Sequence, residues 1–600
     1  MLRTLTDVHQ MFAEFFPEKA IRPYAYLLSK RLEEGHVCIP LSEPTEMAAE
    51  LPGDLIKDLA DPAKLHLLDR LVGQPGSVVP FILDDDRLYL QRYHAYETRI
   101  VELVRKKVDK GQASVGERMA ALEAQRDLIR SLMATYPTIG LREDERIDWQ
   151  LIAALNALLA DFSIITGGPG TGKTTTLAKL LRILYAMQPD AKIALAAPTG
   201  KAAMRMLESL KRSASDFPED VKQKIEKLKP YTLHRLLGYQ HHQVTFKYNM
   251  ENPLPLDFVI VDEASMVDMP MFSKLLEAMG EQGRLVLLGD KDQLASVEAG
   301  SLLGDLCQSV DKGQLNGFSD GLSDWLNDFI SDPDRRITDT YRRTTDGVLA
   351  ERIVELKLSH RFKALGDIGL LSRAIIGGDT DAVGKMMDAN TSTTVRFDSG
   401  DDDKILEAFV AGYEHFIKEP DPAMALQRLN DLRVLVTVRE GPRGLYQINR
   451  RIEELLQARK LIRTGRDFYD HRPVIVTRNN YELGLFNGDI GITRKEGNKH
   501  RVYFENESGE MRPILSAYLS HCETVYAMTI HKSQGSEFSR VLVILPDDRK
   551  NPILTRELLY TGVTRAKESV IVRGSRETVL HTVAQQVRRI SGITGRMARS

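Results

Sequence analysis

Short apolar runs alternate with longer amphipathic segments along most of the chain after residue 147. The first set of runs lies at 162–167 (FSIITG), 192–198 (KIALAAP), 257–263 (DFVIVDE) and 284–290 (RLVLLGD). A second set lies at 432–438 (LRVLVTV), 539–545 (SRVLVIL) and 569–574 (SVIVRG). Apolar strands that alternate with amphipathic helices form parallel sheets covered by helices. The pattern therefore predicts an α/β protein with two such units.

Several stretches do not follow this alternation. Residues 1–110 show mostly helical periodicity, and the charge-rich residues 111–145 predict a solvated helical linker. Residues 308–345 are polar and rich in turn formers, which predicts a surface excursion joining the two units. Residues 242–254 (HQVTFKYNMENPL) favour a β-hairpin. In 472–514, short strands separated by Asn-Gly, Gly-Asn and Ser-Gly turns predict a small β-barrel or hairpin insertion.

The composition is that of an ordinary soluble protein, with 42% hydrophobic and 28% charged residues. Its 600 residues are too many for one core and predict three to four domains. The net charge of −3 gives no general attraction for polyanions, so a nucleic acid would need local basic patches. Cys38, Cys307 and Cys522 lack the spacing of a metal site or a disulfide framework. Because no signal-peptide core or membrane-spanning stretch is found, we expect a cytoplasmic protein without membrane contact.

The segment GGPGTGKTTTLAKLL, which starts at Gly167, fits the phosphate-binding pattern G-x-x-x-x-G-K-[ST]. It follows an apolar strand and opens an amphipathic helix, which is the context that the motif requires. Glycines allow backbone N–H groups to surround phosphate oxygens, and the helix N-terminus adds a favourable dipole. We expect Lys173 to reach the β- and γ-phosphates and the Thr174 hydroxyl to bind Mg²⁺. The motif predicts a nucleoside triphosphatase.

Two further strand ends carry polar residues that suit the same chemistry. The run 258–261 ends in Asp262, which is placed to hold Mg²⁺ through its water shell, and in Glu263, which is placed to orient and deprotonate water. Gln293 follows the next strand and can sense a γ-phosphate by gaining or losing a hydrogen bond. Taken alone, the two acids could form a helix cap, and the glutamine could be an ordinary surface residue. Beside the phosphate loop, the acid pair supports nucleotide hydrolysis.

Many segments together resemble the motifs of one family. They are DWQLIAAL at 148, GGPGTGKTTT at 167, LAAPTGKAAMRM at 195, TLHRLLG at 232, VIVDEASMVD at 259, LLGDKDQLASVEAGSLLGDL at 287, LKLSHRF at 356, VREGPRGLYQIN at 438, RNNYELGLFNGDIG at 478, AMTIHKSQGSEF at 527 and LLYTGVTRAKE at 558. GHVCIPL and DRLYLQRY add similarity near the N-terminus. In this order the segments resemble those of superfamily 1 DNA helicases, and specifically of the RecD family, the alpha subunits of the RecBCD enzyme (exodeoxyribonuclease V).

The resemblance implies tandem RecA-like P-loop NTPase domains, in which parallel sheets are covered by helices. The divisions that it implies are a mainly helical partner-docking domain at 1–110, a helical linker at 111–145, motor domain 1 at 146–345 with a short hairpin insertion at about 240–254, and motor domain 2 at 346–600 with an SH3-like β insertion at about 470–525.

The resemblance also implies roles for single residues. Gln150 resembles a glutamine that reads the adenine edge, and Gly535 resembles a glycine whose backbone runs near the nucleotide. Arg361 and Arg565 resemble two arginines that enter the ATP site from the second RecA-like domain, although a surface salt bridge is the commoner fate of an arginine. The implied catalytic set is Lys173, Asp262, Glu263, Gln293, Arg361 and Arg565, with Thr174 and Asp262 on the metal. The implied nucleotide-binding set is Gln150, Gly167, Gly168, Pro169, Gly170, Thr171, Gly172, Lys173, Thr174, Thr175 and Gly535.

A further set of residues is suited to a nucleic-acid strand. Proteins hold single strands by basic and hydroxyl side chains on phosphates and by rings stacked on bases. In the family, several of the quoted motifs face the single strand. The candidates are Thr199, Lys201, Thr232, His234, Asn480, Tyr481, Asn487, Thr529, His531 and Lys532. A solitary His or Thr after a strand is more often structural, so each of these has a structural alternative.

The resemblance implies an ATP-dependent 5′-to-3′ DNA helicase that uses ATP and Mg²⁺. The implied partners are single-stranded DNA, DNA ends, and the RecB-like and RecC-like subunits of a heterotrimer that processes double-strand ends for recombinational repair. The nuclease site is expected on another subunit. Two alternatives stay open at this point. The chain could be an ATP-switched regulatory or scaffold subunit without unwinding activity, or it could be an RNA-directed relative.

Overall fold

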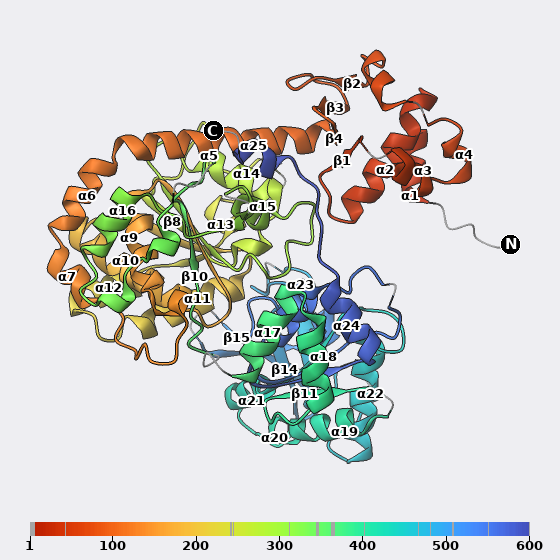
Figure 1. Ribbon diagram of the computed structural model, residues 1–600. Helices are drawn as coiled ribbons and strands as arrows, with labels where there is room; N and C mark the ends of the chain where they lie inside the picture. Colours follow the sequence, from red (N-terminus) through yellow and green to blue (C-terminus); the bar gives the residue numbers. More distant parts are fainter. Residues whose placement is uncertain are drawn as a thin grey trace.

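A computed structural model of the protein shows two α/β lobes and a smaller N-terminal domain, which is set apart at the upper right of Figure 1. The structure describes residues 7–598 except 43, 60, 241–242, 244, 311–312, 344–346, 362–365, 401, 466, 481, 507–508 and 550, and for 44–46 it describes the backbone alone. Within these residues, no helix combines the length and the apolar character that crossing a membrane requires.

The first lobe is built on a six-stranded parallel sheet. Its strand order is β10-β5-β9-β8-β6-β7, with bounds Ile353–Leu356, Phe162–Gly167, Arg284–Gly289, Phe258–Val261, Ile193–Ala197 and Pro230–Thr232. Successive residues point to opposite faces, so Ile165 and Ile260 pack into one core and Ile164 and Val259 into another. Because both faces are buried, the central strands are almost wholly apolar, which is why they could be found in the sequence.

Helices cover both faces of this sheet. One core contains residues of α9 (Trp149–Leu159), α10 (Lys173–Met187), α11 (Gly200–Ser213), α12 (Glu219–Glu226) and α16 (Asp320–Asn327). The other contains residues of α5 (Gln91–Ala113), α13 (Leu233–Leu236), α14 (Met269–Ala278), α15 (Leu302–Gln308) and α25 (Ile593–Ala598). The long helix α5 runs along the first lobe and packs on α14 (Figure 1). Motor domain 2 was predicted to extend to residue 600. This bound is wrong, because α25 returns to the first lobe.

The second lobe is built on a five-stranded parallel sheet. Its strand order is β11-β20-β19-β12-β18, with bounds Val395–Asp398, Ala566–Arg573, Phe538–Ile544, Leu432–Val436 and Ala527–Thr529. One face packs on α17 (Asp367–Gly377), α18 (Thr380–Ala389), α23 (Arg556–Val563) and α24 (Arg576–Ala584). The other packs on α19 (Lys404–Val410), α20 (Glu414–Ile417), α21 (Pro422–Leu429) and α22 (Leu445–Ala458). The fold is therefore the expected tandem of α/β lobes.

Between α22 and β18 the chain forms a separate antiparallel sheet. Its strand order is β16-β15-β14-β13-β17, with bounds Met511–Leu515, Lys499–Glu505, Ile490–Glu496, Pro473–Val476 and Cys522–Thr524. Val474, Val502 and Ile514 belong to a small core of its own. This inserted sheet lies where the β insertion was expected, and its closure into an SH3-like barrel stays a prediction.

The N-terminal domain combines short strands with helices. Its strand order is β1-β4-β3-β2, with bounds Cys38–Pro40, Arg87–Leu90, Phe81–Asp84 and Val72–Gly73, and its helices include α1 (Val8–Glu14), α2 (Arg22–Glu33), α3 (Pro44–Ala49) and α4 (Gly53–Ile56). Its core, which includes Tyr24, Leu28 and Phe81, is separate from the cores of the lobes. The domain ends where α5 begins, at Gln91, which is earlier than the predicted boundary at 110.

Residues 111–145 are not the solvated linker that their charge predicted. The helices α6 (Val115–Glu123) and α7 (Arg126–Ser131) bury Leu122 and Ile129 in a core of the first lobe. Arg118 of α6 also forms an ion pair with the buried Asp161. Arg126, between Leu122 and Ile129, also packs over the ring of Phe329 at 5.0 Å, so the arm is attached to the first lobe by polar as well as apolar contacts.

The region between the lobes also differs from the prediction. Residues 308–345 are not a surface excursion, because Phe318, Leu326 and Phe329 are buried in the first lobe. β10 then pairs with β5 in the first sheet, so the boundary between residues 345 and 346 was placed too early. Neither feature has a strong local signal: the apolar residues are scattered among polar ones, and β10 is only four residues long.

The β-hairpin expected at about 240–254 is not formed by the residues that the structure describes there. Residues 245–254 form bends and irregular backbone. The Asn249 side chain accepts hydrogen bonds from the backbone N–H groups of Glu251 at 2.9 Å and Asn252 at 3.1 Å. Such side-chain contacts favour a turn and compete with the pairing of strands.

Candidate functional site

The loop between β5 and α10 forms one wall of the candidate site. Gly172 has φ +87°, a left-handed conformation that favours glycine, and it packs against the side chain of Gln150. α10 begins at Lys173, so the helix dipole and the unpaired N–H groups of its first turn lie at this loop. The Lys173 ammonium donates to the carbonyl oxygens of Gly167 at 2.6 Å and Gly168 at 3.3 Å. The loop thus supplies the donors and the charge that bind a phosphate group.

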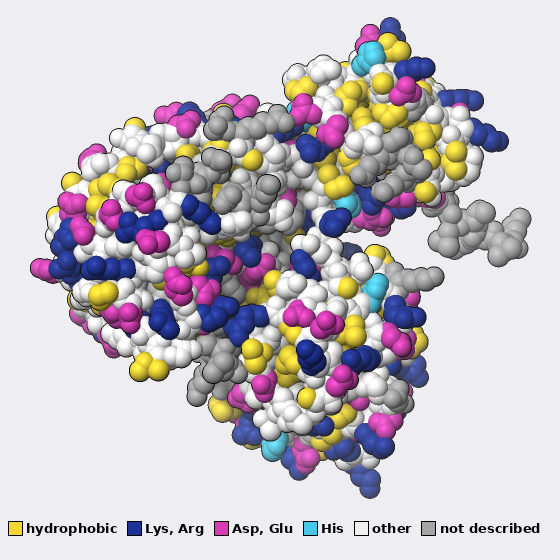
Figure 2. All heavy atoms as spheres, in the orientation of Figure 1, with side chains coloured by type: hydrophobic (Ala, Val, Ile, Leu, Met, Phe, Trp, Pro, Cys, Tyr) yellow, Lys and Arg dark blue, Asp and Glu magenta, His cyan; other side chains and the backbone are white. Residues whose placement is uncertain are grey.

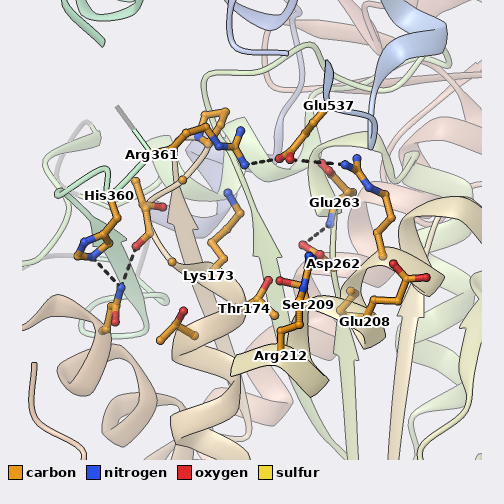
Figure 3. Close-up of a pocket in the computed structure, with 18 of the residues that line it drawn as sticks. Lys173, Thr174, Glu208, Ser209, Arg212, Asp262, Glu263, His360, Arg361 and Glu537 are labelled. Atoms are coloured by element: carbon orange, nitrogen blue, oxygen red, sulfur yellow. Dashed lines mark hydrogen bonds and ion pairs between the residues drawn. The ribbon is translucent and has the colours of Figure 1, made fainter. Parts of the chain in front are cut away.

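A cavity of about 670 Å³ lies between the two lobes beside this loop. We call it the cleft. It is lined by most of the residues predicted for nucleotide binding and catalysis: Gln150, Pro169, Gly170, Thr171, Gly172, Lys173, Thr174, Thr175, Asp262, Glu263, Gln293, Arg361, Gly535 and Arg565. Figure 3 shows Lys173, Thr174 and Asp262 around one space, with Arg361 and Glu537 on its upper side. The fold therefore brings together groups that are far apart in the sequence.

Asp262 and Glu263 follow β8 and supply the acidic groups of the cleft. Asp262 Oδ1 accepts a hydrogen bond from the backbone N–H of Glu263 at 2.8 Å. Burial and the charge of Glu263 raise the pKa of Asp262 to about 6, although Lys173 opposes the shift. A half-buried pair of adjacent acids favours a bound cation, and the Thr174 hydroxyl in the same cleft is a suitable further ligand.

Gln293 lies in the turn after β9 and is linked to the second lobe. Its Nε2 donates to Asp290 Oδ2 at 3.0 Å, and its buried Oε1 has no hydrogen-bond partner among the described residues. The same oxygen of Asp290 accepts a hydrogen bond from the Tyr560 hydroxyl of α23 at 3.0 Å. Tyr560 was not among the predicted residues, because a tyrosine in the apolar run of LLYTGVTRAKE reads as part of a core. Tyr560 of the second lobe thus holds the same carboxylate that accepts a hydrogen bond from Gln293.

Arg361 was predicted to enter the cleft from the second lobe, and this prediction is wrong. Arg361 follows β10, which belongs to the first sheet. The backbone N–H of His360 donates to the Gly170 carbonyl at 2.8 Å, and the Ser359 hydroxyl donates to the Pro169 carbonyl at 3.0 Å. Because β10 extends the first sheet, the segment that carries Arg361 is attached to the phosphate loop itself.

Arg565 does come from the second lobe, directly after the residue that caps α23. Its side chain is buried at the cleft. Nε donates to the Thr561 carbonyl at 3.1 Å, and Nη1 donates to the Ser536 carbonyl at 3.3 Å. These neutral acceptors orient the guanidinium without cancelling its charge. Such a group is suited to meet an anion held by the first lobe, and its catalytic role stays a prediction.

Sequence reasoning missed two charged residues of the cleft, Arg205 and Glu537. Glu537 forms ion pairs with three cations: Arg361, Arg205 at 3.5 Å and Lys567 at 3.5 Å. Figure 3 shows the pair with Arg361. Arg205, on α11 of the first lobe, also donates to the Gly535 carbonyl of the second lobe. Burial by itself would raise the pKa of Glu537, but the neighbouring cations hold it at about 2. Arg205 lies in the motif LAAPTGKAAMRM and Glu537 in the motif AMTIHKSQGSEF. A charged side chain within a motif was the only feature of the sequence that could have marked them as site residues.

Three residues predicted to contact nucleic acid lie at the carboxyl ends of β6 and β7 of the first lobe. The Oγ1 atoms of Thr199 and Thr232 each accept a backbone N–H three residues further on, at 3.2 Å, and thereby cap α11 and α13. The ring of His234 meets the ring of Phe246 edge-on at 5.9 Å between centroids, and burial lowers its pKa. Each therefore has a structural task as well.

Lys201, in the first turn of α11, lies close to the inserted sheet. Burial and nearby arginines lower the pKa of Lys201 to about 7, although Asp489 and Glu505 of the inserted sheet oppose the shift. A lysine in this state gains from any anion that restores its charge. The position of Lys201 is therefore suited to a phosphate group.

The predicted residues of the second lobe lie at the carboxyl end of β18, whose last residue is Thr529. Thr529 is buried, and its Oγ1 accepts the backbone N–H of Lys532 at 3.3 Å. Burial lowers the pKa of both His531 and Lys532. Like the first-lobe residues, these groups lie at the carboxyl ends of parallel strands, the edge at which such sheets usually bind ligands.

The predicted residues of the insertion lie in the connection between β13 and β14. Asn480 Oδ1 accepts a hydrogen bond from the backbone N–H of Leu483 at 3.0 Å. The backbone N–H of Asn487 donates to Asn479 Oδ1 at 2.8 Å. Tyr481 lies outside the described residues. The two asparagines thus help to shape this connection, and their contact with nucleic acid stays a prediction.

Three family models match the chain in comparisons with known proteins. The model described as an AAA domain matches residues 150–299, and that of a UvrD-like helicase C-terminal domain matches residues 524–572. The model of the RecBCD enzyme subunit RecD, N-terminal domain, matches residues 3–89. The matches fall on the first lobe, the end of the second lobe and the N-terminal domain.

Several known proteins are similar over long stretches. The RecBCD enzyme subunit RecD of Mycobacterium tuberculosis is 34% identical over 581 residues, which cover 95% of this chain and 88% of that protein. Its namesake in Haemophilus influenzae is 34% identical over 551 residues, or 86% and 81% of the two chains. The ATP-dependent RecD2 DNA helicase of Deinococcus radiodurans is 29% identical, covering 75% of this chain and 53% of its own. Among solved structures, Bacteroides Pif1 bound to ssDNA is 16% identical with a TM-score of 0.37, covering 74% of this chain and 94% of that one.

The charges of the cleft predict the effect of replacing Glu537 by Gln. The variant should be less stable without nucleotide by about 1–3 kcal/mol, because the cations around this position would lose their counter-charge. ATP should raise the melting temperature of the variant more than that of the unmodified protein, because its phosphates supply negative charge to the same cations. Thermal unfolding with and without ATP measures both effects. Glu568→Gln, on a nearby exposed residue, is the matched control, and equal ATP-induced shifts in all three proteins would contradict the prediction.

Proposed function

This chain belongs to the RecD family, and we propose that it is the ATP-driven DNA helicase motor of a RecBCD-type complex, which moves 5′ to 3′ on single-stranded DNA. The observation that carries the proposal is the cleft, in which the phosphate loop and the acid pair of one lobe face Arg565 of the other. A nucleotide site divided between two lobes can convert hydrolysis into relative motion of those lobes. The polarity is supported by the family alone.

The first lobe would bind most of the ATP molecule. Lys173 would exchange its two carbonyl partners for the β- and γ-phosphates, and Gln150 lies beside the loop where it could contact the base. Thr174 and Asp262 would hold Mg²⁺, which when bound neutralises phosphate charge. Glu263 would orient and deprotonate the attacking water. The raised pKa of Asp262 supports a cation at this position.

The second lobe would respond to the γ-phosphate through Arg565. This guanidinium donates to two neutral carbonyl groups, and a phosphate would be a stronger partner for it. In other phosphoryl-transfer enzymes, an arginine of this kind contributes about 10³- to 10⁵-fold to the rate. When the γ-phosphate leaves, the attraction is lost and the lobes can part.

Direct contacts between the lobes support this coupling. The backbone N–H of Leu294 donates to the Thr561 hydroxyl at 3.1 Å, and its carbonyl accepts a hydrogen bond from Gln534 Nε2 at 3.0 Å. These bonds join the residue after Gln293 to two motifs of the second lobe. A change at Gln293 would therefore reach the second lobe through one peptide unit.

The DNA strand would cross the ends of β6, β7 and β18, where the predicted contact residues lie. Thr199, Thr232 and Thr529 use an oxygen lone pair to accept a backbone N–H. Each keeps its O–H hydrogen as a donor, which is what a phosphate oxygen requires. Lys201 and Lys532 would add charge at the same edge.

The N-terminal domain would dock onto a RecC-like subunit, and a RecB-like subunit would carry the nuclease site. The helix α1 supports this role, because Val8, Met11 and the following Phe15 are 64%, 58% and 82% exposed. Ile56 of α4 is also exposed, and Figure 2 shows hydrophobic side chains gathered on this domain. Exposed apolar groups at helical spacing are typical of a surface that a protein partner covers.

Lys173→Gln tests the motor function directly. The variant should lose at least about 10²-fold of its DNA-stimulated ATPase rate and all strand separation, because the phosphates lose their cation, while single-strand binding persists. The exposed Lys192 gives the control Lys192→Gln, which should behave like the unmodified protein. Unchanged strand separation by Lys173→Gln would refute the proposal. In the unmodified protein, an ATPase rate indifferent to DNA would favour a switched scaffold, and equal stimulation by RNA would favour an RNA-directed enzyme.

The apolar surface of α1 predicts the effect of the double variant Met11→Ser, Phe15→Ser. It should no longer co-purify with the RecB-like and RecC-like subunits, because the buried apolar area at the contact would be lost. Its ATPase activity as an isolated chain should be unchanged, since both residues are exposed and lie on the N-terminal domain, whose core is separate from those of the lobes. The matched control is Ile139→Ser, which alters a residue that is 94% exposed elsewhere. Co-purification of the double variant at the unmodified level would contradict the assignment.

The lowered pKa of Lys201 predicts a pH dependence of DNA affinity. In the free protein this lysine loses its proton as the pH rises through about 7. A bound phosphate would raise the pKa again, so binding takes up a proton and the affinity should fall, by up to about tenfold, as the pH rises from 7 to 8.5. Lys201→Arg stays charged over this range and should remove that part of the dependence. Fluorescence anisotropy with a labelled oligonucleotide measures it, and identical pH profiles would exclude Lys201 from the DNA site.

A further inference from the structure

The last segment of the chain crosses from the second lobe back to the first. After α24 it passes the N-terminal domain and ends in α25, which packs on α15 and α5 (Figure 1). We call residues 586–598 the C-terminal strap. Ile593 and Met597 are fully buried in a core of the first lobe. The strap is therefore a covalent tie between the lobes that does not pass through the cleft.

Arg589 joins the strap to residues 294–300, which we call the sensor loop because it directly follows Gln293. Its Nη1 donates to the carbonyl oxygens of Ser296 at 2.7 Å, Glu298 at 3.1 Å and Gly300 at 2.7 Å. The sensor loop contains no helix or strand, so its carbonyl groups depend on side-chain donors. The Ser296 hydroxyl within the loop also donates to the carbonyl of Glu298 at 3.1 Å. The Arg589 guanidinium therefore ties three carbonyl groups of this loop to the strap.

The two ends of the sensor loop are attached to different parts of the molecule. Leu294 is hydrogen-bonded to the second lobe, as described above. At the other end, the backbone N–H of Gly300 donates to the carbonyl of Gly35 in the N-terminal domain at 2.8 Å. Within eight residues, the chain therefore runs from the nucleotide cleft to the second lobe, the strap and the N-terminal domain.

The strap also packs directly on the N-terminal domain. The backbone N–H of Val37 donates to the Ile590 carbonyl at 2.8 Å, and the backbone N–H of Ile590 donates to His36 Nδ1 at 3.2 Å. Gly35 has φ +91°, and a Cβ atom there would lie 2.7 Å from Arg589 Nε. Only glycine therefore allows Arg589 to reach the sensor loop past this turn.

We propose that Arg589 is a positioning residue that makes the N-terminal domain follow the nucleotide state of the cleft. When Gln293 changes its contacts with a γ-phosphate, the sensor loop that follows it is displaced. Its bonds to Arg589 and Gly35 carry this displacement to the turn at residues 35–37. The inference rests on the proposed ATP-driven function and adds the route by which ATP is reported to a docked partner subunit.

Hydrogen–deuterium exchange of the full chain tests this route, with a non-hydrolysable ATP analogue and Mg²⁺ as the probe. In the unmodified protein, the analogue should slow exchange at residues 167–175 and also change it at Gly300 and Val37. In Arg589→Met, Gly300 and Val37 should exchange about tenfold faster without nucleotide, because their partners are less well fixed. The analogue should still protect residues 167–175 of the variant but no longer alter Gly300 or Val37.

Matched variants separate this role from a general effect on folding. The neighbouring Arg588 is exposed, so Arg588→Met should respond to the analogue like the unmodified protein. Arg589→Lys keeps the charge but not the forked group, and it should lose most of the response at Val37. Exchange in β5 and β9 reports whether each variant is folded, and Arg589→Lys supplies the comparison if Arg589→Met is not.

Two results would overturn the inference. One is a nucleotide response at Val37 that is equal in the unmodified protein and in the folded Arg589 variant. The other is loss of that response in Arg588→Met. A failure of the proposed function looks different, because residues 167–175 of the unmodified protein would then show no protection by the analogue.

Discussion

Positive charge in the cleft needs an acceptor in every state of the protein, and this constraint governs how the two lobes meet. Lys173 donates to two carbonyl groups of its own loop, and Arg565 donates to two of the second lobe. Arg361 is paired with Glu537. A triphosphate offers these cations more negative charge than their present partners do, in a cleft where charges are weakly screened. Nucleotide binding would therefore exchange internal contacts for new ones and would change the contact between the lobes in the same step.

Few groups of the second lobe would take part in this exchange of contacts, because most residues that line the cleft belong to the first lobe. Arg361 belongs to the first lobe. The second lobe lines the cleft with the charged side chains of Arg565 and Glu537. These two would respond in opposite ways to a phosphate anion, one attracted and the other displaced from its cations. The relative position of the lobes would thus depend on whether the cations of the first lobe pair with Glu537 or with a phosphate. The hydrogen bonds between the turn after β9 and α23 would change with that position.

The parts of the site that could be predicted from the sequence are those whose chemistry is local. The phosphate loop needs a strand, glycines and a helix start within a few residues, and the acid pair ends a single apolar run. The burial of Leu122, the pairing of β10 with β5 and the ion pair of Arg205 with Glu537 depend on partners far away in the chain. Periodicity shows that a residue could be buried, but it does not show against what. The motif found Arg361, yet only the order of strands in the sheet revealed from which lobe it approaches.

The path of the chain limits how the lobes can move. α5 and α25 both pack on the first lobe, so this lobe takes elements that precede and follow the second lobe in the chain, and the second lobe is inserted between β10 and the strap. A body attached to another by two tethers can rotate about the line that joins the attachment points, but it cannot slide freely away. Closure on a nucleotide would then be a hinge rotation about an axis that the two tethers define. The strap, as one of these tethers, is hydrogen-bonded to the N-terminal domain, so a small rotation about this axis would change those local contacts without pulling the domains apart.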